Sequence, residues 1–425
     1  MSSDVAHFQN NASARPKISL QGPTISDTSL KAQLIVQGLK APTSMAFLGP
    51  EVILVTEKNH GMVQKIVKGN VTEPLIHVDV SKKDERGLLG IALSNFTDTR
   101  ADSNPGYVFL YYSKAPSDNK SEVNSVYRYE LNDGKLINPK LLLELPGLPG
   151  PQHNGGKLII GPDNNLYIAI GDVGGSIISN ATETKAQNYV NGSDPDGRAG
   201  IIRITQAGEP IAGGIIGSTP ILNTYYAYGI KNIFGFDFDP VTRNMWDSEN
   251  GPTFGDEINL VEPGFNSGWA KVQGIWYVQS QEGQQTEPSR GEKAPENPQI
   301  MVDFDGKGKY SSPEFTWAHS VAPTALKFLN SNKLGGQYEN DIFVGDAKYG
   351  NIYHFELNQN RTELSLEGNL TAKVAEKVED MGNSIFGSGF GVITDLQVGP
   401  DGYLYVLSYD KSDGRIYKIV SSTSN

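Results

Sequence analysis

The 425-residue chain contains no cysteine. It can therefore form no disulfide framework, thiolate zinc site, iron–sulfur cluster or cysteine nucleophile. The absence does not fix the compartment, because a chain of this length buries a sizeable core without covalent cross-links. The chemistry left to a site is that of histidine, carboxylates and a hard metal bound through oxygen.

Long apolar runs and excess positive charge are also missing. No run approaches the roughly 18 apolar residues that span a bilayer. The 36 basic residues face 48 acidic ones, a net charge of −12 without a basic stripe, which disfavours nucleic acid as a partner. Residues Met1–Asn11 contain no apolar segment of a signal peptide, so we expect such a signal to be absent or already removed.

Asn-X-Ser/Thr sequons favour export, because glycosylation would place them on an exported surface. The alternative is that asparagine-rich turns happen to precede hydroxyl residues. On the first interpretation the protein is secreted, periplasmic or on the cell surface. The eight sequons begin at Asn11, Asn70, Asn95, Asn119, Asn180, Asn191, Asn360 and Asn369.

Glycine and proline are abundant, with 47 and 24 residues, which disfavours a helical bundle and favours short strands joined by tight turns. Helical signals are scarce. Alternating or β-rich runs predict strands at Glu51–Thr56, Tyr107–Ser113, Ser125–Leu131, Asn165–Ile170, Gly200–Thr205, Asp341–Gly345, Asn351–Leu357, Tyr403–Ser408 and Arg415–Val420.

A turn-plus-strand unit recurs along the chain, most clearly as GPDNNLYIAIGD from Gly161 and GPDGYLYVLSYD from Gly399. Six copies at intervals of roughly 65 residues fit four-stranded antiparallel sheets that close into a ring. The sequence therefore predicts an all-β fold, a six-bladed β-propeller of four-stranded antiparallel blades. A pair of β-sandwiches is the alternative. We expect residues 1–30 to be a flexible polar leader and residues 31–425 to form one propeller domain.

Two polar, glycine-rich insertions, Val173–Arg198 and Gln273–Tyr310, interrupt the repeat. On a propeller such loops rise over one face, where ligand sites usually lie. Each contains an Asp-X-Asp-Gly string, beginning at Asp194 and Asp303. Such a string can hold Ca²⁺, but neither has the following ligands of an EF-hand, which favours ordinary turns.

Among the six histidines, His153 has an unusual context, between Pro151 and the glycines 155 and 156. A histidine in a rigid loop is a candidate general base. Asp172 ends a predicted strand nineteen residues later and would orient the ring if the strand brings the two together. A structural histidine that caps a turn is the alternative interpretation of this spacing.

A series of motifs spanning about residues 30–420 resembles the soluble glucose/sorbosone dehydrogenases. These are aldose sugar dehydrogenases that depend on pyrroloquinoline quinone (PQQ) and fold as six-bladed propellers. The motifs are His153-Asn-Gly-Gly-Lys-Leu, Gly161-Pro-Asp-Asn-Asn-Leu-Tyr-Ile, Gly171-Asp172, Tyr228-Gly-Ile-Lys-Asn232, Glu249-Asn-Gly-Pro252, Gly255-Asp-Glu-Ile-Asn-Leu-Val-Glu-Pro-Gly-Phe-Asn-Ser-Gly-Trp269, Trp317-Ala-His-Ser-Val-Ala-Pro323, Phe343-Val-Gly-Asp-Ala-Lys348 and Asp395-Leu-Gln-Val-Gly-Pro-Asp-Gly-Tyr-Leu-Tyr405.

The resemblance implies oxidation of a sugar C1 hydroxyl to a lactone, with hydride passing to the quinone C5 carbonyl. His153 would take the hydroxyl proton and Asp172 would support it. A Ca²⁺ held by carbonyls at Gly251 and Pro252 would polarise the quinone. By the same resemblance Gln152 and Asp256 lie near the substrate, and Glu257 lies at a second, structural Ca²⁺.

The implied PQQ contacts are Lys231, Asn232, Trp317, His319 and Lys348, and here the sequence departs from the family. Lys231 replaces an arginine, Phe234 replaces a glutamine, and His319 stands where a small hydroxyl residue is usual. Two further arginines are replaced by Val392 and Thr394. Because PQQ carries three carboxylates, their loss weakens its binding.

The sequence therefore supports two classes of function. The first is a PQQ-dependent aldose dehydrogenase-like oxidoreductase, acting on a small sugar or polyol with an external electron acceptor. The alternative is a propeller that has lost PQQ and serves as a carbohydrate-binding or surface module, or as a metal-assisted lactonase-type hydrolase. Either would be a monomer or a homodimer without a transmembrane segment.

Overall fold

The computed structural model describes residues 16, 19, 22–94, 106–115, 122–174, 183–279 and 288–423. In these ranges the protein is built of β-strands, and its helical elements are short 3₁₀ helices. The helices are η2 (Lys185–Gln187), η3 (Leu222–Thr224), η4 (Gly336–Tyr338), η5 (Gly368–Ala372) and η6 (Val378–Ser384). The predicted all-β class is confirmed.

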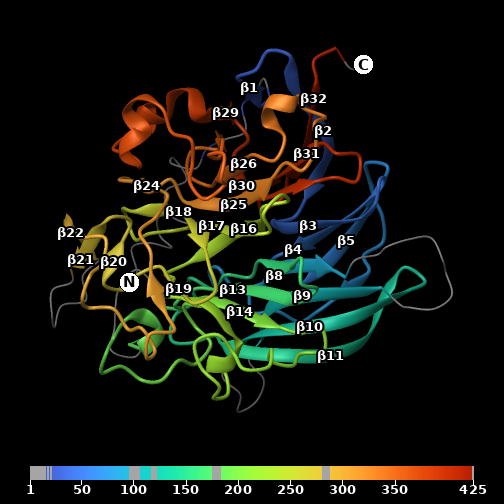
Figure 1. Ribbon diagram of the computed structural model, residues 1–425. Helices are drawn as coiled ribbons and strands as arrows, with labels where there is room; N and C mark the ends of the chain where they lie inside the picture. The colour runs from blue at the N-terminus through green and yellow to red at the C-terminus, as the bar shows by residue number, and fades with distance from the viewer. Residues whose placement is uncertain are drawn as a thin grey trace.

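Three of the sheets are built around strands from the first 204 residues, and the third of them adds strands from further along the chain (Figure 1). One contains β3 (Pro42–Gly49), β4 (Val52–Glu57), β5 (Met62–Val67), β6 (Asn70–Val71) and β7 (Ile76–His77). The next contains β8 (Leu88–Leu93), β9 (Tyr107–Lys114), β10 (Val123–Asn132) and β11 (Lys135–Pro146). The third contains β12 (Leu158–Ile160), β13 (Leu166–Ile170), β14 (Gly200–Ile204), β15 (Tyr225–Tyr228), β19 (Phe265–Asn266) and β23 (Lys309–Tyr310).

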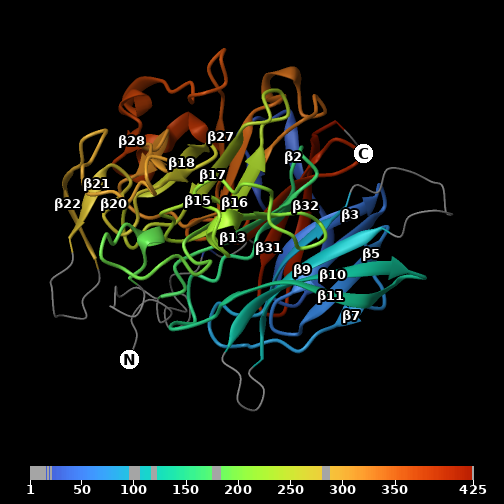
Figure 2. The ribbon, with the colours of Figure 1, turned by 60° about the horizontal axis from the view of Figure 1, so that its bottom comes forward.

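The second half of the chain adds three sheets of similar size and one smaller sheet. The first contains β16 (Ile233–Phe238), β17 (Met245–Glu249), β18 (Asp256–Val261), β24 (Phe315–Trp317) and β28 (Val374–Ala375). The next contains β25 (Pro323–Phe328), β26 (Ile342–Asp346), β27 (Ile352–Phe355), β29 (Ile385–Ser388) and β1 (Thr24–Ile25). The last contains β30 (Val392–Val398), β31 (Leu404–Tyr409), β32 (Gly414–Ser421) and β2 (Leu30–Leu39). The small sheet contains β20 (Val272–Gln273), β21 (Trp276–Gln279) and β22 (Ser289–Lys293), and it lies at one edge (Figure 2).

The six larger sheets close into a ring. Inner strands of consecutive sheets contact one another, and the contacts run from β3 through β8, β12, β13, β16, β25 and β30 back to β3. Strand β2, from the start of the chain, pairs antiparallel with β32 from its end, so one sheet joins both ends (Figure 1). This arrangement is consistent with a β-propeller. The sheets contain three to six strands rather than a uniform four, and three strand pairs are parallel.

The hydrophobic core lies between neighbouring sheets. Apolar residues cluster at each junction of the ring, for example Leu54 with Leu88 and Ile201 with Ile233. In the inner strand β13 every residue is buried, whereas most residues of the outer strand β11 are exposed. All nine strands predicted from the alternating pattern are present with similar bounds, because burial on two faces selects β-branched and aromatic residues.

Two predictions about loops and termini need correction. The leader ends earlier than residue 30, because Thr24 and Ile25 pair with β29 and the Ser26 N–H donates to the carbonyl of Phe386. The second insertion is not only loop, since it contributes β21, β22 and β23. Within the described ranges no helix is long and apolar enough to cross a membrane.

Both Asp-X-Asp-Gly strings adopt local turn structure. Asp194 pairs with Lys185 at 2.7 Å, and Asp196 accepts a fork of hydrogen bonds from Arg198. In the second string Asp305 has a positive φ of 60°, as in a tight turn. Lys185 and Arg198 thus already pair with the two carboxylates of the first string.

Candidate active site

A buried histidine–aspartate pair forms the centre of the candidate site. The Nδ1 of His153 lies 2.7 Å from Asp172 Oδ1, and the two side chains are 9% and 6% exposed. Asp172 Oδ1 also accepts the Gly174 N–H at 3.0 Å, and Oδ2 accepts the indole N–H of Trp269 at 2.9 Å. Three donors therefore hold this carboxylate in one orientation.

The ionisation of Asp172 follows from these contacts. Burial raises the pKa of Asp172, but the charge and hydrogen bond of His153 and the charge of Lys231 lower it more. Its pKa therefore lies below the ordinary value, and the carboxylate is charged at neutral pH. A charged carboxylate only accepts hydrogen bonds, so the proton between the two residues belongs to His153 Nδ1.

Glycines let the two elements of this pair approach closely. Gly171 separates Asp172 from the end of β13, and a Cβ at Gly171 would lie 2.6 Å from the carbonyl oxygens of both His153 and Lys231. His153 itself has a φ of +58°, which is rare outside glycine and typical of strained functional positions. The packing of backbone against backbone at Gly171 thus brings His153, Asp172 and Lys231 together.

The loop that carries His153 is anchored from the neighbouring sheet. The His153 N–H donates to Glu85 Oε2 at 2.6 Å. Arg86, whose side chain is 1% exposed, pairs with Glu122 and donates to the carbonyls of Gly147 and Gly150. Glu85 and Arg86 therefore position the loop before and at His153.

Lys231 contacts the other nitrogen of the imidazole. Its Nζ lies 3.0 Å from His153 Nε2, and the lysine is 3% exposed. An ammonium has donors but no acceptor, so Nε2 accepts and carries no proton. The same ammonium lies 5.7 Å from the Trp269 ring centroid. His153 therefore holds its proton on Nδ1 and its lone pair on Nε2.

Hydrogen bonds connect this centre to the next two sheets. The backbone carbonyl of Asn232 accepts the Asn250 N–H at 2.9 Å. Six residues after Asn250, the buried Asp256 accepts the N–H groups of Gly251, Val321 and Ala322 and the hydroxyl of Ser320. Lys348 Nζ donates to the Ser320 carbonyl at 2.9 Å. Lys231, Asn232, Gly251, Asp256 and Lys348 therefore belong to one connected region.

The other predicted residues of the site are placed less directly. Trp317 is buried in the core, at 4.9 Å from Phe315 and 5.5 Å from Tyr353 between ring centroids, so its ring packs against protein. His319 is exposed, and Gln152 is 6% exposed in the loop before His153. Asp256, which is expected near the substrate, accepts three backbone N–H groups and the Ser320 hydroxyl.

At the positions of the missing arginines the structure provides no charge to a ligand. The Thr394 hydroxyl donates to the Pro42 carbonyl at 3.1 Å, and Val392 is apolar. The adjacent Asp395 forms a buried ion pair with Lys157 at 2.6 Å. Phe234 is partly exposed on β16.

A second group of buried polar residues lies where β17 and β18 pair. Asp247 is directly opposite Asn259, and Glu249 is directly opposite Glu257. The Asn259 amide nitrogen lies 3.1 to 3.2 Å from one oxygen of each carboxylate. Gln273 donates to Glu257 at 2.9 Å. All five side chains are at most 1% exposed.

The electrostatics of this group favour a cation. Burial raises the pKa of Asp247 and of Glu257 to about 8. Burial, together with the charges of Asp247 and Glu257, raises the pKa of Glu249 well above its usual range. The described residues give these three carboxylates only neutral hydrogen-bond donors, so protons or a metal must compensate their charge.

The residues present fit Ca²⁺ at this second group. Four buried oxygens have no hydrogen-bond partner among the described residues: Asp247 Oδ2, Glu249 Oε2, Asn259 Oδ1 and Gln273 Oε1. Carboxylate and amide oxygens are the ligands Ca²⁺ prefers. The described residues contain no ready-made group of three acidic or histidine side chains in metal-binding geometry. A cation would therefore need these side chains to rotate.

The residues present also fit PQQ, with point charges in place of arginine forks. The buried Asn232 Oδ1 lacks a hydrogen-bond partner within the described ranges, and it lies beside the ammonium-bearing Lys231. Lys348 is exposed in the connected region. Two ammonium groups attract carboxylates without aligning them in a bidentate pair.

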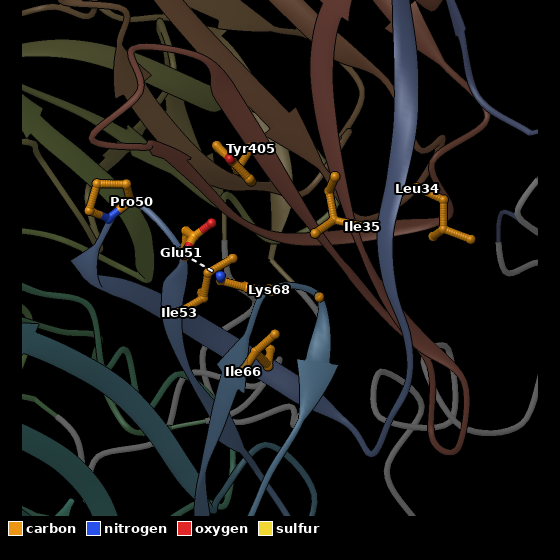
Figure 3. A pocket seen from close by; sticks show the side chains of 9 residues that line it. Leu34, Ile35, Pro50, Glu51, Ile53, Ile66, Lys68 and Tyr405 are labelled. Atoms are coloured by element: carbon orange, nitrogen blue, oxygen red, sulfur yellow. Dashed lines mark ion pairs between the residues drawn. The ribbon is translucent and has the colours of Figure 1, made fainter. Parts of the chain in front are cut away.

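A shallow pocket of about 280 Å³ lies elsewhere, between β2 and the sheet of β4 and β5 (Figure 3). Its lining includes Ile35, Pro50 and Tyr405, and an exposed ion pair joins Glu51 and Lys68 at 3.3 Å. An exposed pair contributes less than about 1 kcal/mol. The lining shares no residue with the candidate site.

Sequence reasoning missed Trp269 as a partner of Asp172 and missed the group around Asn259. A signal for the latter exists, since Asp247 and Glu249, like Glu257 and Asn259, are two residues apart and point to one face of a strand. Trp269 has no local signal, because its contact joins segments 97 residues apart.

The fold and the site together define a ring of β-sheets in which His153 and Asp172 pair on the segments that flank the inner strands β12 and β13. The chain belongs to the Glucose / Sorbosone dehydrogenase family, whose model matches residues 39–418. It is 27% identical over 406 residues to the aldose sugar dehydrogenase YliI of Escherichia coli, which covers 92% of this chain and 93% of the relative. It is 29% identical over 267 residues to quinoprotein glucose dehydrogenase B of Acinetobacter calcoaceticus, covering 57% of this chain and 52% of that protein.

A solved structure supports the fold assignment. The PQQ-bound form of an aldose sugar dehydrogenase from Streptomyces coelicolor superposes with a TM-score of 0.65 at 20% identity. The match covers 92% of this chain and 98% of that one. The resemblance noted in the sequence is therefore confirmed at the level of the family and its fold.

Proposed function

We propose that the protein is an aldose sugar dehydrogenase-like oxidoreductase that oxidises a sugar C1 hydroxyl to the lactone, with His153 as the base. The observation that carries the proposal is the buried Asp172–His153 pair, in which the carboxylate fixes the proton on Nδ1 and leaves the Nε2 lone pair to accept one. A binding module has no need of such a pair. The relatives named as an aldose sugar dehydrogenase and a glucose dehydrogenase support a sugar as the substrate class.

In this proposal Nε2 of His153 takes the hydroxyl proton of the sugar, and Asp172 stabilises the imidazolium that forms. The C1 hydrogen leaves with its electron pair, so the sugar loses two electrons and two protons overall. When bound, PQQ supplies the acceptor for that hydride, and a Ca²⁺ at the Gly251 and Pro252 carbonyls supplies Lewis acidity. Lys231, Asn232 and Lys348 would hold PQQ through charge and hydrogen bonds.

The same proposal covers the propeller architecture, the electron acceptor, the oligomeric state and a structural metal. The six larger sheets would be the blades of a six-bladed propeller within one domain, which the closed set of inner-strand contacts supports. An external electron acceptor would take up the two electrons removed from the sugar, and the protein would act as a monomer or homodimer. We further propose that residues 247, 249, 257, 259 and 273 hold a structural Ca²⁺. Glu257 is the ligand among them that the sequence resemblance implied.

Export to the periplasm, the cell surface or the medium is proposed from the sequons. The four that fall in the described ranges, at Asn70, Asn191, Asn360 and Asn369, are all exposed, as glycosylation requires. The other four, including Asn11 and Asn95, lie outside the described residues. Mass spectrometry of protein secreted by a eukaryotic host would reveal glycans at the exposed sites, and unmodified peptides there would contradict this part.

The function is tested by titrating the purified protein with PQQ and Ca²⁺ and measuring aldose-dependent reduction of a dye. The proposal expects turnover that saturates in both PQQ and aldose. Lack of dye reduction and of any absorbance change at saturating PQQ contradicts it and favours the module or hydrolase, as the replacements at Val392 and Thr394 suggest. A parallel assay of lactone hydrolysis distinguishes the hydrolase from the binding module.

A further inference from the structure

The lone pair that the proposed base needs is occupied in the structure. Lys231 Nζ lies 3.0 Å from His153 Nε2, while the opposite ring nitrogen is held by Asp172 at 2.7 Å. Because the Asp172 carboxylate accepts the proton on Nδ1, Nε2 of the neutral imidazole is an acceptor, and the Lys231 Nζ donates to it. A sugar hydroxyl cannot use the same lone pair at the same time.

The charges around the imidazole reinforce this block. Among the described residues, the groups that bond to the ring are Asp172, which carries a negative charge, and Lys231, whose ammonium carries a positive charge. If His153 accepts a proton, two positive charges lie about 3 Å apart in a buried site and repel each other strongly. A further negative charge near Lys231 offsets the positive charge that His153 gains.

Lys231 also has reason to stay where it is until such a charge arrives. It is 3% exposed, and a desolvated ammonium is costly without partners. His153 Nε2, the field of Asp172 and the Trp269 ring at 5.7 Å stabilise it. Its four-carbon stem can swing, whereas the ring of His153 is fixed by Asp172 on one side and by a loop that Glu85 and Arg86 anchor.

We propose that Lys231 caps the base: in the unliganded protein its ammonium occupies Nε2 of His153, and a carboxylate-bearing ligand must draw it away before the base can act. The inference rests on the proposed function, since it assigns a positioning role within that reaction. The carboxylate can come from PQQ or from a sugar acid such as a uronate. A neutral sugar alone does not release the cap.

The test observes the Nε2 nucleus of His153 directly in protein labelled with ¹⁵N-histidine, at pH 8 and without cofactor. The resonance is assigned by its loss in His153→Ala. Lys231→Met removes the ammonium with little change in volume, and Lys271→Met is the matched control, because that lysine stacks on Tyr189 at 3.9 Å and has no described contact with His153. Near-UV circular dichroism verifies that each variant is folded.

The cap predicts that Nε2 of His153 moves downfield in Lys231→Met, as an unprotonated nitrogen does when it loses a hydrogen bond, and does not move in Lys271→Met. Carbethoxylation of the His153 peptide by diethyl pyrocarbonate should also become at least about tenfold faster in Lys231→Met, from the loss of one charge-assisted hydrogen bond. An unchanged resonance and an unchanged labelling rate in Lys231→Met overturn the cap.

Release is tested on the wild-type protein with three ligands: PQQ with Ca²⁺, glucuronate and glucose. A downfield shift with PQQ assigns the releasing carboxylate to the cofactor, and a shift with glucuronate alone assigns it to the substrate. No shift with either, or an equal shift with glucose, overturns the release step. Because capping is measured in resting protein, it can hold even if dye reduction fails, so the two failures are distinguishable.

Discussion

Asp172→Asn removes one charge and one acceptor from a carboxylate that now accepts three hydrogen bonds. If the remaining oxygen faces His153 Nδ1 and the Gly174 N–H, the new amide group faces the indole N–H of Trp269, and two donors oppose each other. If the amide is flipped, it opposes Gly174 and forces the histidine proton to Nε2, where Lys231 already donates. The first orientation has fewer conflicts, so we expect the Trp269 donor to lose its partner.

A buried donor left without a partner costs about 1–3 kcal/mol of unfolding free energy. Turnover should fall about 10³-fold to 10⁴-fold, because the imidazolium loses the carboxylate that stabilises it. Urea unfolding measures the first effect and PQQ-dependent dye reduction the second. Asp163→Asn is the matched control, since Asp163 is a partly exposed turn residue of the same sheet, and it should leave turnover unchanged.

A double-mutant cycle isolates the cause. In a Trp269→Phe background the opposed indole donor is absent. Asp172→Asn should therefore lower the unfolding free energy by at least about 1 kcal/mol less there than in the wild type. An equal cost in both backgrounds would refute the assignment of Trp269 as the third donor to Asp172. An unchanged turnover of Asp172→Asn would refute the role of the carboxylate in orienting the base.

Three further results are expected. Arg86→Met should lower the unfolding free energy by about 3 kcal/mol, because Glu122 and two carbonyls lose a buried partner, and urea unfolding with an unchanged midpoint would contradict this. Burial raises the pKa of Asp346 to about 6, so its contribution to stability is complete below about pH 4 and is lost as the pH rises through about 6. Between pH 4 and pH 7 the unfolding free energy of the wild type should thus fall by about 3 kcal/mol more than that of Asp346→Asn. Parallel pH profiles of the unfolding free energy in the two proteins would argue against this. Millimolar Ca²⁺ should raise the melting temperature, EGTA should reverse the rise, and Glu257→Gln should abolish it, whereas a Ca²⁺ response retained in that variant would place the cation elsewhere.

The sequence predicted the elements whose burial follows a period of two. Strands such as β13 and β31 were located because buried β-rich runs end at recognisable turns. The pairing of His153 with Asp172 was a hypothesis from spacing along one strand and its preceding loop, and the structure brings the two within 2.7 Å. Neither inference required knowledge of how distant segments pack.

The parts that sequence reasoning missed depend on such packing. Lys231 reaches His153 across 78 residues, and no local pattern indicates that the end of β13 lies between their backbones at Gly171. The acidic group at β17 and β18 depends on a strand register that pairs Glu249 with Glu257. The position of Trp317 in its motif does not reveal that its indole packs against Phe315, and its place beside PQQ stays a prediction.

His153→Ala, measured for both PQQ binding and turnover, tests the central claim most directly. The imidazole is the proposed base, whereas the charges proposed to hold PQQ lie on Lys231 and Lys348. The account therefore predicts that dye reduction is abolished while the PQQ absorbance titration remains close to that of the wild type. Turnover in His153→Ala at the wild-type rate would contradict it.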